Sequence, residues 1–358
     1  MIAVIADDIT GAAEMAGIAR HFGLRVELVM DVPDSADCDV LVIATDTRSM
    51  PEEEAARESR RVAEALRKVN GVDAIFKKTD SALRGHVVAE LAAILAATDY
   101  KKALYLPANP SKGRTIRQGV YYIGDRQLHE TDFSFDPEFP AVSSCLEERF
   151  PNAASKNISF ADAVMEKDIE LAVKLADDGM TVFAGAADLF TAFLRHTLGC
   201  SPVEGQPCIP DLSDCLIICG STQSKPVDCG AVTMWMPLDV YDGDSDAAAE
   251  WIKGLCDAFI ENKAMILAVS HHHRTGREVA VYLRGLMADV VASLVGIRSP
   301  KELIIEGGAT AYSILRRLSG RSFAVTDQLA PGVVRMLATD GTHITMKPGS
   351  YPWGSLFV

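Results

Sequence analysis

Two adjacent carboxylates follow the first apolar run of the chain. Asp7 and Asp8 come directly after Ile2–Ala6, and Thr10 and Gly11 follow them. Neighbouring aspartates can accept hydrogen bonds from substrate hydroxyls, act as a general base or hold a metal ion. Gly11 favours this interpretation, because glycine lets a ligand approach the backbone closely. The structural alternative is that one aspartate, or Thr10, only caps the helix that begins here.

A second group of polar side chains occupies residues 77–85, with the sequence KKTDSALRG. Arg84 can clamp a substrate carboxylate with two parallel hydrogen bonds, and Lys78 can neutralise charge on an anion. The alternative is a solvated turn in which Asp80 or Ser81 caps the next helix. We expect both groups to face one crevice, because each follows a strand of the same predicted sheet. The candidate residues of this segment are Lys78, Asp80, Ser81, Arg84 and Gly85.

Residues 107–115, PANPSKGRT, open a long polar segment. Lys112 and Arg114 can form a mobile flap over an anionic substrate, and an ordinary solvated loop is the alternative. The stretch 109–140, which contains Pro and Gly, is too long for an ordinary connection. Such segments in compact domains usually carry function.

Small residues follow two predicted strands in the second half of the chain. The sequence GSTQS (220–224) comes after Cys215–Cys219, and GGAT (307–310) comes after Leu303–Ile305. Such turns let backbone N–H groups at a helix N-terminus hold phosphates, although any tight strand–helix turn has a similar composition. Neither is a Walker A motif, and no GxGxxG stands at a strand–helix junction, which disfavours a P-loop kinase and a Rossmann dehydrogenase.

Three consecutive histidines, 271–273, follow the apolar run Ala264–Val269. Side chains of consecutive residues diverge in extended backbone, and no Cys or carboxylate stands at ligand spacing beside them. We therefore expect a polar loop here and assign no metal ligand to the protein.

Apolar runs alternate with helical patterns along most of the chain. This alternation predicts an α/β fold with mostly parallel sheets flanked by helices. Ser49 and Glu52 predict a capping box for the second helix. Gly and Pro concentrate in 199–210, which is the expected linker. The expected domains are therefore 1–205 and 211–358, with a ligand cleft between them. Strands of the first series are expected at Ile2–Ala6, Val26–Met30, Val40–Ala44, Ala74–Phe76 and Ala103–Leu106.

The composition excludes several classes of partner. Lys and Arg number 35 against 49 Asp and Glu, a net charge of −14, whereas a nucleic-acid backbone requires a basic face. Apolar runs such as Leu91–Ala97 are shorter than the about 18–20 residues that span a bilayer. The N-terminus lacks the basic segment of a signal peptide, and the eight cysteines form no C-x-x-C motif. We expect a cytoplasmic protein with free thiols and with neither membrane nor nucleic-acid partners.

Several motifs resemble those of the four-carbon acid sugar kinase family. ADDITGA (residues 6–12) is similar to the ADDxTGA opening of that family, and KTDSALRG (78–85) is similar to its KxDSxLRG motif. PANPSKGRT resembles a third family motif, and GGATA (307–311) resembles the nucleotide motif GG[DE]TA. The segment 347–351, KPGSY, loosely follows K[ST]GNFG. Ala309 stands where the family usually has an acidic residue.

The resemblance implies an ATP-dependent kinase that phosphorylates an alcohol group of a four-carbon sugar acid such as threonate, erythronate or 3-oxo-tetronate. ATP would bring Mg²⁺ to the C-terminal, nucleotide-binding domain, and the N-terminal domain would bind the acid sugar. The implied catalytic residues are Asp7, Asp8 and Asp80. The implied substrate contacts are Thr10, Gly11, Lys78, Ser81, Arg84, Gly85, Lys112 and Arg114. The implied nucleotide contacts are Ser221, Ser224, Gly307, Gly308, Ala309, Thr310 and Gly349.

Two other functions compete with the kinase. The altered residue Ala309 allows a non-catalytic sensor of sugar acids and nucleotides. An NAD-dependent sugar-acid dehydrogenase is disfavoured, because the dinucleotide fingerprint is absent. The sequence leaves the oligomeric state open, and a homo-oligomer is compatible with it.

Overall fold

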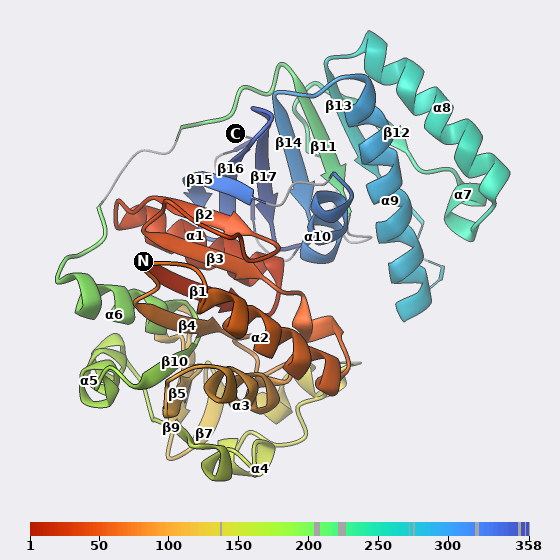
Figure 1. The fold of residues 1–358 in the computed structure, drawn as a ribbon. Helices are drawn as coiled ribbons and strands as arrows, with labels where there is room; N and C mark the ends of the chain where they lie inside the picture. The colour runs from red at the N-terminus through yellow and green to blue at the C-terminus, as the bar shows by residue number, and fades with distance from the viewer. Residues whose placement is uncertain are drawn as a thin grey trace. The chain divides into compact units, whose positions relative to one another are not determined.

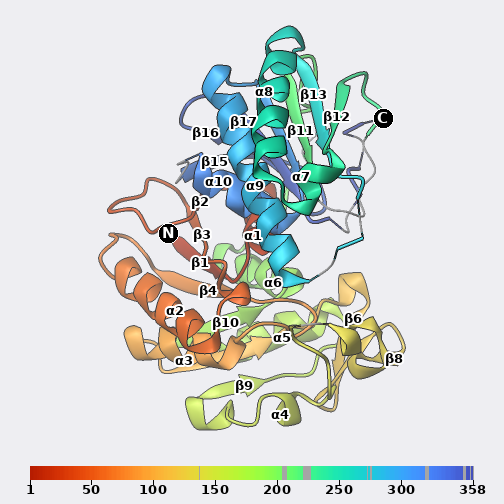
Figure 2. The same ribbon diagram turned by 90° about the vertical axis from the view of Figure 1, so that its right-hand side faces the viewer.

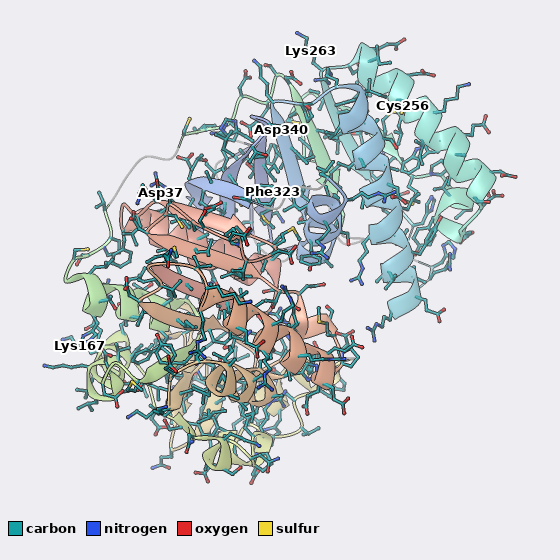
Figure 3. The ribbon with its side chains drawn as sticks, in the orientation of Figure 1. Asp37, Lys167, Cys256, Lys263, Phe323 and Asp340 are labelled. Carbon is teal, nitrogen blue, oxygen red and sulfur yellow. The ribbon has the colours of Figure 1, made fainter. Side chains whose placement is uncertain are left out.

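The computed structural model describes the chain except residues 137, 204–207, 221–226, 272, 275, 319–321, 350–351, 355 and 358. The chain divides into two compact units, Met1–Glu204 and Gly205–Val358, each containing strands and helices (Figure 1). The eight cysteines are free thiols. Charged side chains such as Lys167 and Lys263 are exposed and extend away from the ribbon (Figure 3).

Within the first unit the strand order is β2-β3-β1-β4-β10-β5-β9, and neighbouring strands are parallel. Their short apolar runs are mostly buried, as is typical of parallel strands covered by helices. Ala6 of β1 pairs with Ala44 of β3 and with Lys78 of β4, so these three strands end level. The strands are β1 (Ile2–Ala6), β2 (Val26–Val29), β3 (Val40–Ala44), β4 (Ala74–Lys78), β5 (Lys102–Leu106), β9 (Ile158–Phe160) and β10 (Thr181–Gly185).

Helices cover these strands. Helix α2 packs against α3, and α6 packs against both α1 and α5. Figure 2 shows α2 and α3 on one side of the strands and α5 and α6 on the other. Helix α2 begins after Pro51 without a side-chain cap, so the capping box predicted from Ser49 and Glu52 is wrong. The helices are α1 (Ile9–His21), α2 (Glu52–Leu66), α3 (Val87–Ala97), α5 (Glu166–Ala176) and α6 (Ala187–Leu198).

The polar stretch after β5 contains regular structure. Strands β6 (Arg114–Arg117), β7 (Val120–Ile123) and β8 (Arg126–Gln127) form a small antiparallel sheet, and helix α4 (Leu146–Arg149) follows. Strands this short give little alternation of polar and apolar residues, so the pattern does not predict them. Strand β7 buries Tyr121 completely.

Within the second unit the strand order is β12-β13-β11-β14-β17-β16-β15. Neighbours from β12 to β17 are parallel, whereas β17, β16 and β15 pair antiparallel. The strands of this unit are therefore parallel, as expected, except that β15 and β16 pair antiparallel to their neighbours. The strands are β11 (Cys215–Cys219), β12 (Val232–Trp235), β13 (Ala264–Ala268), β14 (Glu302–Glu306), β15 (Ser322–Ala330), β16 (Val333–Ala338) and β17 (His343–Lys347). The helices are α7 (Leu238–Asp242), α8 (Ser245–Glu261), α9 (Arg277–Ile297) and α10 (Gly308–Arg317).

Helix α9 corrects the expectation that no segment is long and apolar enough to span a bilayer. It has 21 residues and passes that test by length and composition. It also packs against α8 and α10, as a helix of an α/β layer does. Its composition is therefore only weak evidence for a membrane.

Candidate functional site

Charged side chains converge where β1, β3 and β4 end. Arg48, in the 3₁₀ helix Thr47–Ser49 after β3, donates from Nε and Nη2 to the two oxygens of Asp7, at 3.0 and 2.8 Å. Nη2 also donates to Asp8 Oδ1 at 3.0 Å, and Nη1 lies 3.6 Å from Asp80 Oδ1. One guanidinium thus joins all three predicted catalytic aspartates, which are called the aspartate cluster (Asp7, Asp8 and Asp80) below.

The sequence motifs assign no role to Arg48. Its segment TDTRS (45–49) follows a buried strand, which is the same signal that identifies Asp7 and Asp80. The strand order, in which β3 lies beside β1, gives this signal its meaning, because the carboxyl ends of adjacent parallel strands form one crevice.

Asp8 both caps a helix and belongs to the aspartate cluster. Its Oδ1 accepts from the Gly11 N–H at 2.9 Å and its Oδ2 accepts from the Thr10 hydroxyl, so it is the N-cap of α1. Asp8 is therefore a helix cap, as the structural alternative predicts, and it is also a member of the aspartate cluster. A Cβ at Gly11 would lie 2.6 Å from Asp8 Oδ1. The immediate reason for glycine here is room for this carboxylate.

Burial and neighbouring charges act differently on the three carboxyls. Burial raises the pKa of Asp7 above its usual value, although Arg48 opposes the shift. Burial also acts on Asp8, but Arg48 and Lys78 outweigh it and hold its pKa below the usual value. Arg48 and Arg84 likewise overcome burial at Asp80 and hold its pKa low. Asp8 has the most exposed side chain of the three, at 19% against 2% for Asp7 and 9% for Asp80.

Asp80 and Arg84 lie in the turn between β4 and α3, which is called the substrate loop (Asp80–Gly85) below. Arg84 donates from Nε and Nη2 to the two oxygens of Asp80, at 3.0 and 2.9 Å. The Nε–Nη2 edge of the Arg84 guanidinium, which is predicted to clamp a substrate, therefore binds Asp80. Nη1 lies 3.4 Å from Asp136 Oδ2.

Gly85 ends the substrate loop beside the aspartate cluster. Its φ is +91°, and a Cβ there would lie 3.3 Å from Asp7 Oδ2. Because L side chains rarely adopt this backbone conformation, glycine is required by geometry at this position.

Arg84 and Arg114, from two separate motifs, approach the same aromatic ring. Their guanidinium carbons lie 5.7 and 6.0 Å from the ring centroid of Phe133. Arg114 also donates to the Ser81 hydroxyl of the substrate loop. The structure therefore brings Ser81, Arg84 and Arg114 together, and two guanidinium groups in one place favour binding of a carboxylate.

Lys78 and Lys112 share a carboxylate, that of Glu14 on α1. Lys112 Nζ lies 2.6 Å from Glu14 Oε1, and Lys78 Nζ lies 3.6 Å from Oε2. Burial raises the pKa of Glu14, but the two lysines outweigh it and hold the pKa below its usual value. Glu14, to which the sequence motifs assign no role, contacts both predicted cations and fixes their position.

A fully buried ion pair lies next to the aspartate cluster. Lys77 Nζ is 2.7 Å from Glu90 Oε2, and the two side chains are 0% and 1% exposed. The same oxygen accepts from the hydroxyls of Thr47, at 2.7 Å, and Ser59, at 3.0 Å. Because Thr47 precedes Arg48, Glu90 of α3 anchors the segment that supplies the central guanidinium.

Gly220, after β11, and the turn 307–310 of the second unit meet at Thr310. Its hydroxyl lies 3.5 Å from the carbonyl oxygen of Gly220, and a Cβ at Gly220 would lie 2.4 Å from that hydroxyl. Gly307 has φ +101° and precedes α10, whose N-terminus has no side-chain cap. Its uncapped first-turn amides fit a phosphate group. Gly308 opens α10 and Ala309 is exposed; Ser221 and Ser224 lie outside the described residues.

Lys347 fixes the end of β17 beside this turn. It is buried and pairs with Glu306, the last residue of β14. The Gly307 N–H donates to the Lys347 carbonyl at 3.0 Å. Gly349 follows two residues later and is exposed. The carboxyl ends of β14 and β17 therefore hold Gly307 and Gly349 in one region.

Within the described part of the chain, no group of three or more His, Cys, Asp or Glu residues is arranged to hold a metal ion. His273 instead lies 2.7 Å from Asp242, and His271 lies 3.1 Å from the Met236 carbonyl. His272 lies outside the described residues.

Family models match both halves of the chain. A sugar-binding N-terminal domain matches residues 2–188, and a nucleotide-binding C-terminal domain matches residues 237–351. A D-threonate kinase from Salmonella typhimurium is 30% identical, over 92% of this chain and 89% of the relative. A D-threonate kinase from Bordetella bronchiseptica is 28% identical (95% and 90%), and a 3-oxo-tetronate kinase from Cupriavidus necator is 25% identical (98% and 94%).

Solved structures share the fold. A putative tRNA synthase from Salmonella typhimurium superposes with a TM-score of 0.79 at 20% identity, covering 99% of this chain and 97% of that one. A Haemophilus influenzae protein superposes with a TM-score of 0.74 at 21% identity, covering 99% and 98%. With both domain models matched in order and relatives aligned over nearly their full length, the chain belongs to the four-carbon acid sugar kinase family.

Proposed function

We propose that this protein is an ATP-dependent kinase that phosphorylates a hydroxyl of a four-carbon sugar acid, of the threonate, erythronate or 3-oxo-tetronate type. The observation that carries the proposal is the aspartate cluster joined by Arg48, inside the sugar-binding domain. The names of the relatives support the substrate class.

Asp8 is the carboxylate we assign to accept the proton of the reacting hydroxyl. It is ionised under ordinary conditions and has the most exposed side chain of the cluster. Asp7 and Asp80 are each held by a two-pronged guanidinium contact. They suit the role of orienting Arg48 and Arg84 rather than exchanging protons. Phosphoryl transfer depends mostly on such positioning and on charge neutralisation.

The sugar acid's own carboxylate fits the region of Arg84 and Arg114. Both guanidiniums lie near Phe133, and Arg114 reaches the substrate loop through Ser81. Lys78 and Lys112, which both contact Glu14, add positive charge to this unit. Binding through these groups explains how a chain of net charge −14 can hold an anion.

Gly307, Gly308 and Thr310 are the residues that we assign to the phosphates of ATP, through the uncapped first turn of α10. Mg²⁺ bound to ATP would neutralise charge on the transferred phosphoryl group. Ala309 supplies no carboxylate, so this chain would hold Mg²⁺ through the nucleotide itself.

The direct test is ADP release with ATP–Mg²⁺ and a panel of D-threonate, L-threonate, D-erythronate and 3-oxo-tetronate. We expect turnover with at least one of these acids and none with the matching aldose sugars, which lack the carboxylate. Binding of a sugar acid without ADP formation would overturn the kinase and favour the sensor that Ala309 allows.

Changing Arg84 to lysine should raise KM for the sugar acid about tenfold, with a smaller effect on kcat. An ammonium cannot hold both oxygens of Asp80 while facing the substrate. Steady-state kinetics at saturating ATP measure the effect, and Arg117→Lys, an exposed arginine of β6, is the matched control. An unchanged KM in the Arg84 variant would remove Arg84 from the substrate site.

A further inference from the structure

The substrate loop contains a strained residue. Leu83 is buried, and its φ is +61°, a left-handed conformation that L side chains other than Asn, Asp and His seldom adopt. Hydrogen bonds within the loop flank this residue. Asp80 Oδ2 accepts from the N–H groups of Ala82, at 2.8 Å, and Arg84, at 3.3 Å, on either side of Leu83. Such a conformation persists when surrounding groups hold it.

Two side chains from outside the loop hold its carbonyl groups. Arg149, the last residue of α4, donates from Nε and Nη2 to the Leu83 carbonyl, at 3.3 and 3.2 Å. The hydroxyl of Tyr121 in β7 donates to the Ser81 carbonyl at 2.5 Å. Tyr121 lies in the stretch 109–140 and Arg149 in helix α4 after it, so elements that follow β5 brace the loop that carries Asp80 and Arg84.

Arg149 has no ion-pair partner among the described residues, which makes its placement unusual. Its third hydrogen bond, from Nη1, goes to the Pro140 carbonyl at 3.3 Å. A partly buried guanidinium whose hydrogen bonds go only to carbonyl groups loses hydration without a direct ion pair. Burial therefore lowers the pKa of Arg149, although Asp136 and Asp80 oppose the shift from farther away. A role in holding the substrate loop gives this guanidinium a function that its hydrogen bonds to the loop support.

We propose that Arg149, supported by Tyr121, is a positioning residue for the sugar acid, because it holds Leu83 in the conformation that aims Arg84 and Asp80. This inference rests on the proposed function. Without Arg149, Leu83 would relax to an ordinary conformation in part of the molecules. Only the remaining fraction would bind the acid, so KM should rise by the inverse of that fraction while kcat stays nearly constant.

The test compares Arg149→Met with Arg126→Met, which changes an exposed arginine of β8 in the same unit. We expect Arg149→Met to raise KM for the sugar acid about tenfold with kcat within about twofold of the wild type. Arg126→Met should match the wild type in both constants. Unchanged KM in Arg149→Met, or an equal change in Arg126→Met, would overturn the proposal.

Hydrogen–deuterium exchange gives a readout that does not depend on catalysis. Peptides covering 79–86 should exchange faster in Arg149→Met than in the wild type or Arg126→Met, without any substrate. Equal exchange of these peptides in Arg149→Met and the wild type would overturn the positioning role, even if KM changes. If wild-type protein has no activity on any sugar acid, the proposed function fails, whereas this exchange difference still decides the role of Arg149.

Chemical rescue separates positioning from a general loss of structure. Arg149 and Leu83 line a cavity of about 600 Å³ that can admit a free guanidinium ion. Millimolar guanidinium chloride should lower the raised KM of Arg149→Ala, and equal NaCl should not. Arg149→Lys, which keeps the charge and loses the fork, should lie between Arg149→Met and the wild type. The assignment is contradicted if added guanidinium does not lower the KM of Arg149→Ala and Arg149→Lys has a KM as high as that of Arg149→Met.

Discussion

Replacing Asp8 with asparagine should lower kcat for sugar-acid phosphorylation by about 10²–10⁴-fold and change KM little. The substitution is selective, because asparagine caps helices about as well as aspartate and so preserves the start of α1. What is lost is the carboxylate that accepts the hydroxyl proton. Steady-state ADP release, with the sugar acid and ATP varied in turn, measures both constants.

Asp34→Asn is the matched control, since Asp34 is an exposed aspartate of the same unit. Circular dichroism and thermal melting should show that Asp8→Asn folds like the control. A kcat within about threefold of the wild type would exclude Asp8 as the proton acceptor. Asp7→Asn and Asp80→Asn in the same assay would then identify which carboxylate takes the role.

The sequence predicts the location of this site because parallel strands repeat a simple rule. Buried apolar runs end at polar residues, and those ends meet at one edge of the sheet. The runs Ile2–Ala6 and Val40–Ala44 are predicted with the bounds that β1 and β3 have. The pairing of Ala6 with Ala44 and Lys78 then places Asp7, Asp8 and Asp80 together, as the motifs indicate.

The partners of these residues are not predictable in the same way. Arg48 becomes central only because β3 is hydrogen-bonded to β1. The order of strands in a sheet cannot be predicted from the local periodicity of the sequence. Glu90 lies on an apolar helix that predicts a core position, yet its carboxylate is matched by Lys77, from a strand. Such contacts between distant residues depend on tertiary packing. Motif analysis therefore finds candidate ligand contacts more readily than the groups that support them.

The segment after β5 shows a second limit. Its Gly and Pro residues correctly indicate a departure from the strand–helix alternation, and its length indicates function. The composition gives no indication that Tyr121, within this segment, and Arg149, in helix α4 after it, hold the substrate loop, because these contacts are made to backbone carbonyls. Any side chain donor of suitable reach can make such a bond, so no residue pattern marks it.

Removing the charge of Glu90 should lower the free energy of unfolding by about 3–5 kcal/mol. Lys77 is 0% exposed, and Glu90→Gln would leave its ammonium buried without its ion-pair partner. Glutamine has nearly the same size and can still accept from Thr47 and Ser59, so neither a cavity nor lost hydroxyl partners explains the effect. Urea unfolding followed by far-UV circular dichroism measures the shift in midpoint.

Glu64→Gln supplies the matched control, because Glu64 pairs with Arg60 at 3.0 Å on the exposed face of α2, where both side chains are 56% exposed. Surface pairs of this kind contribute about 0.2–1 kcal/mol. Adding Lys77→Met to Glu90→Gln should recover part of the lost stability, because neither member of the buried pair then carries a charge. Equal stability of Glu90→Gln and Glu64→Gln would contradict the prediction.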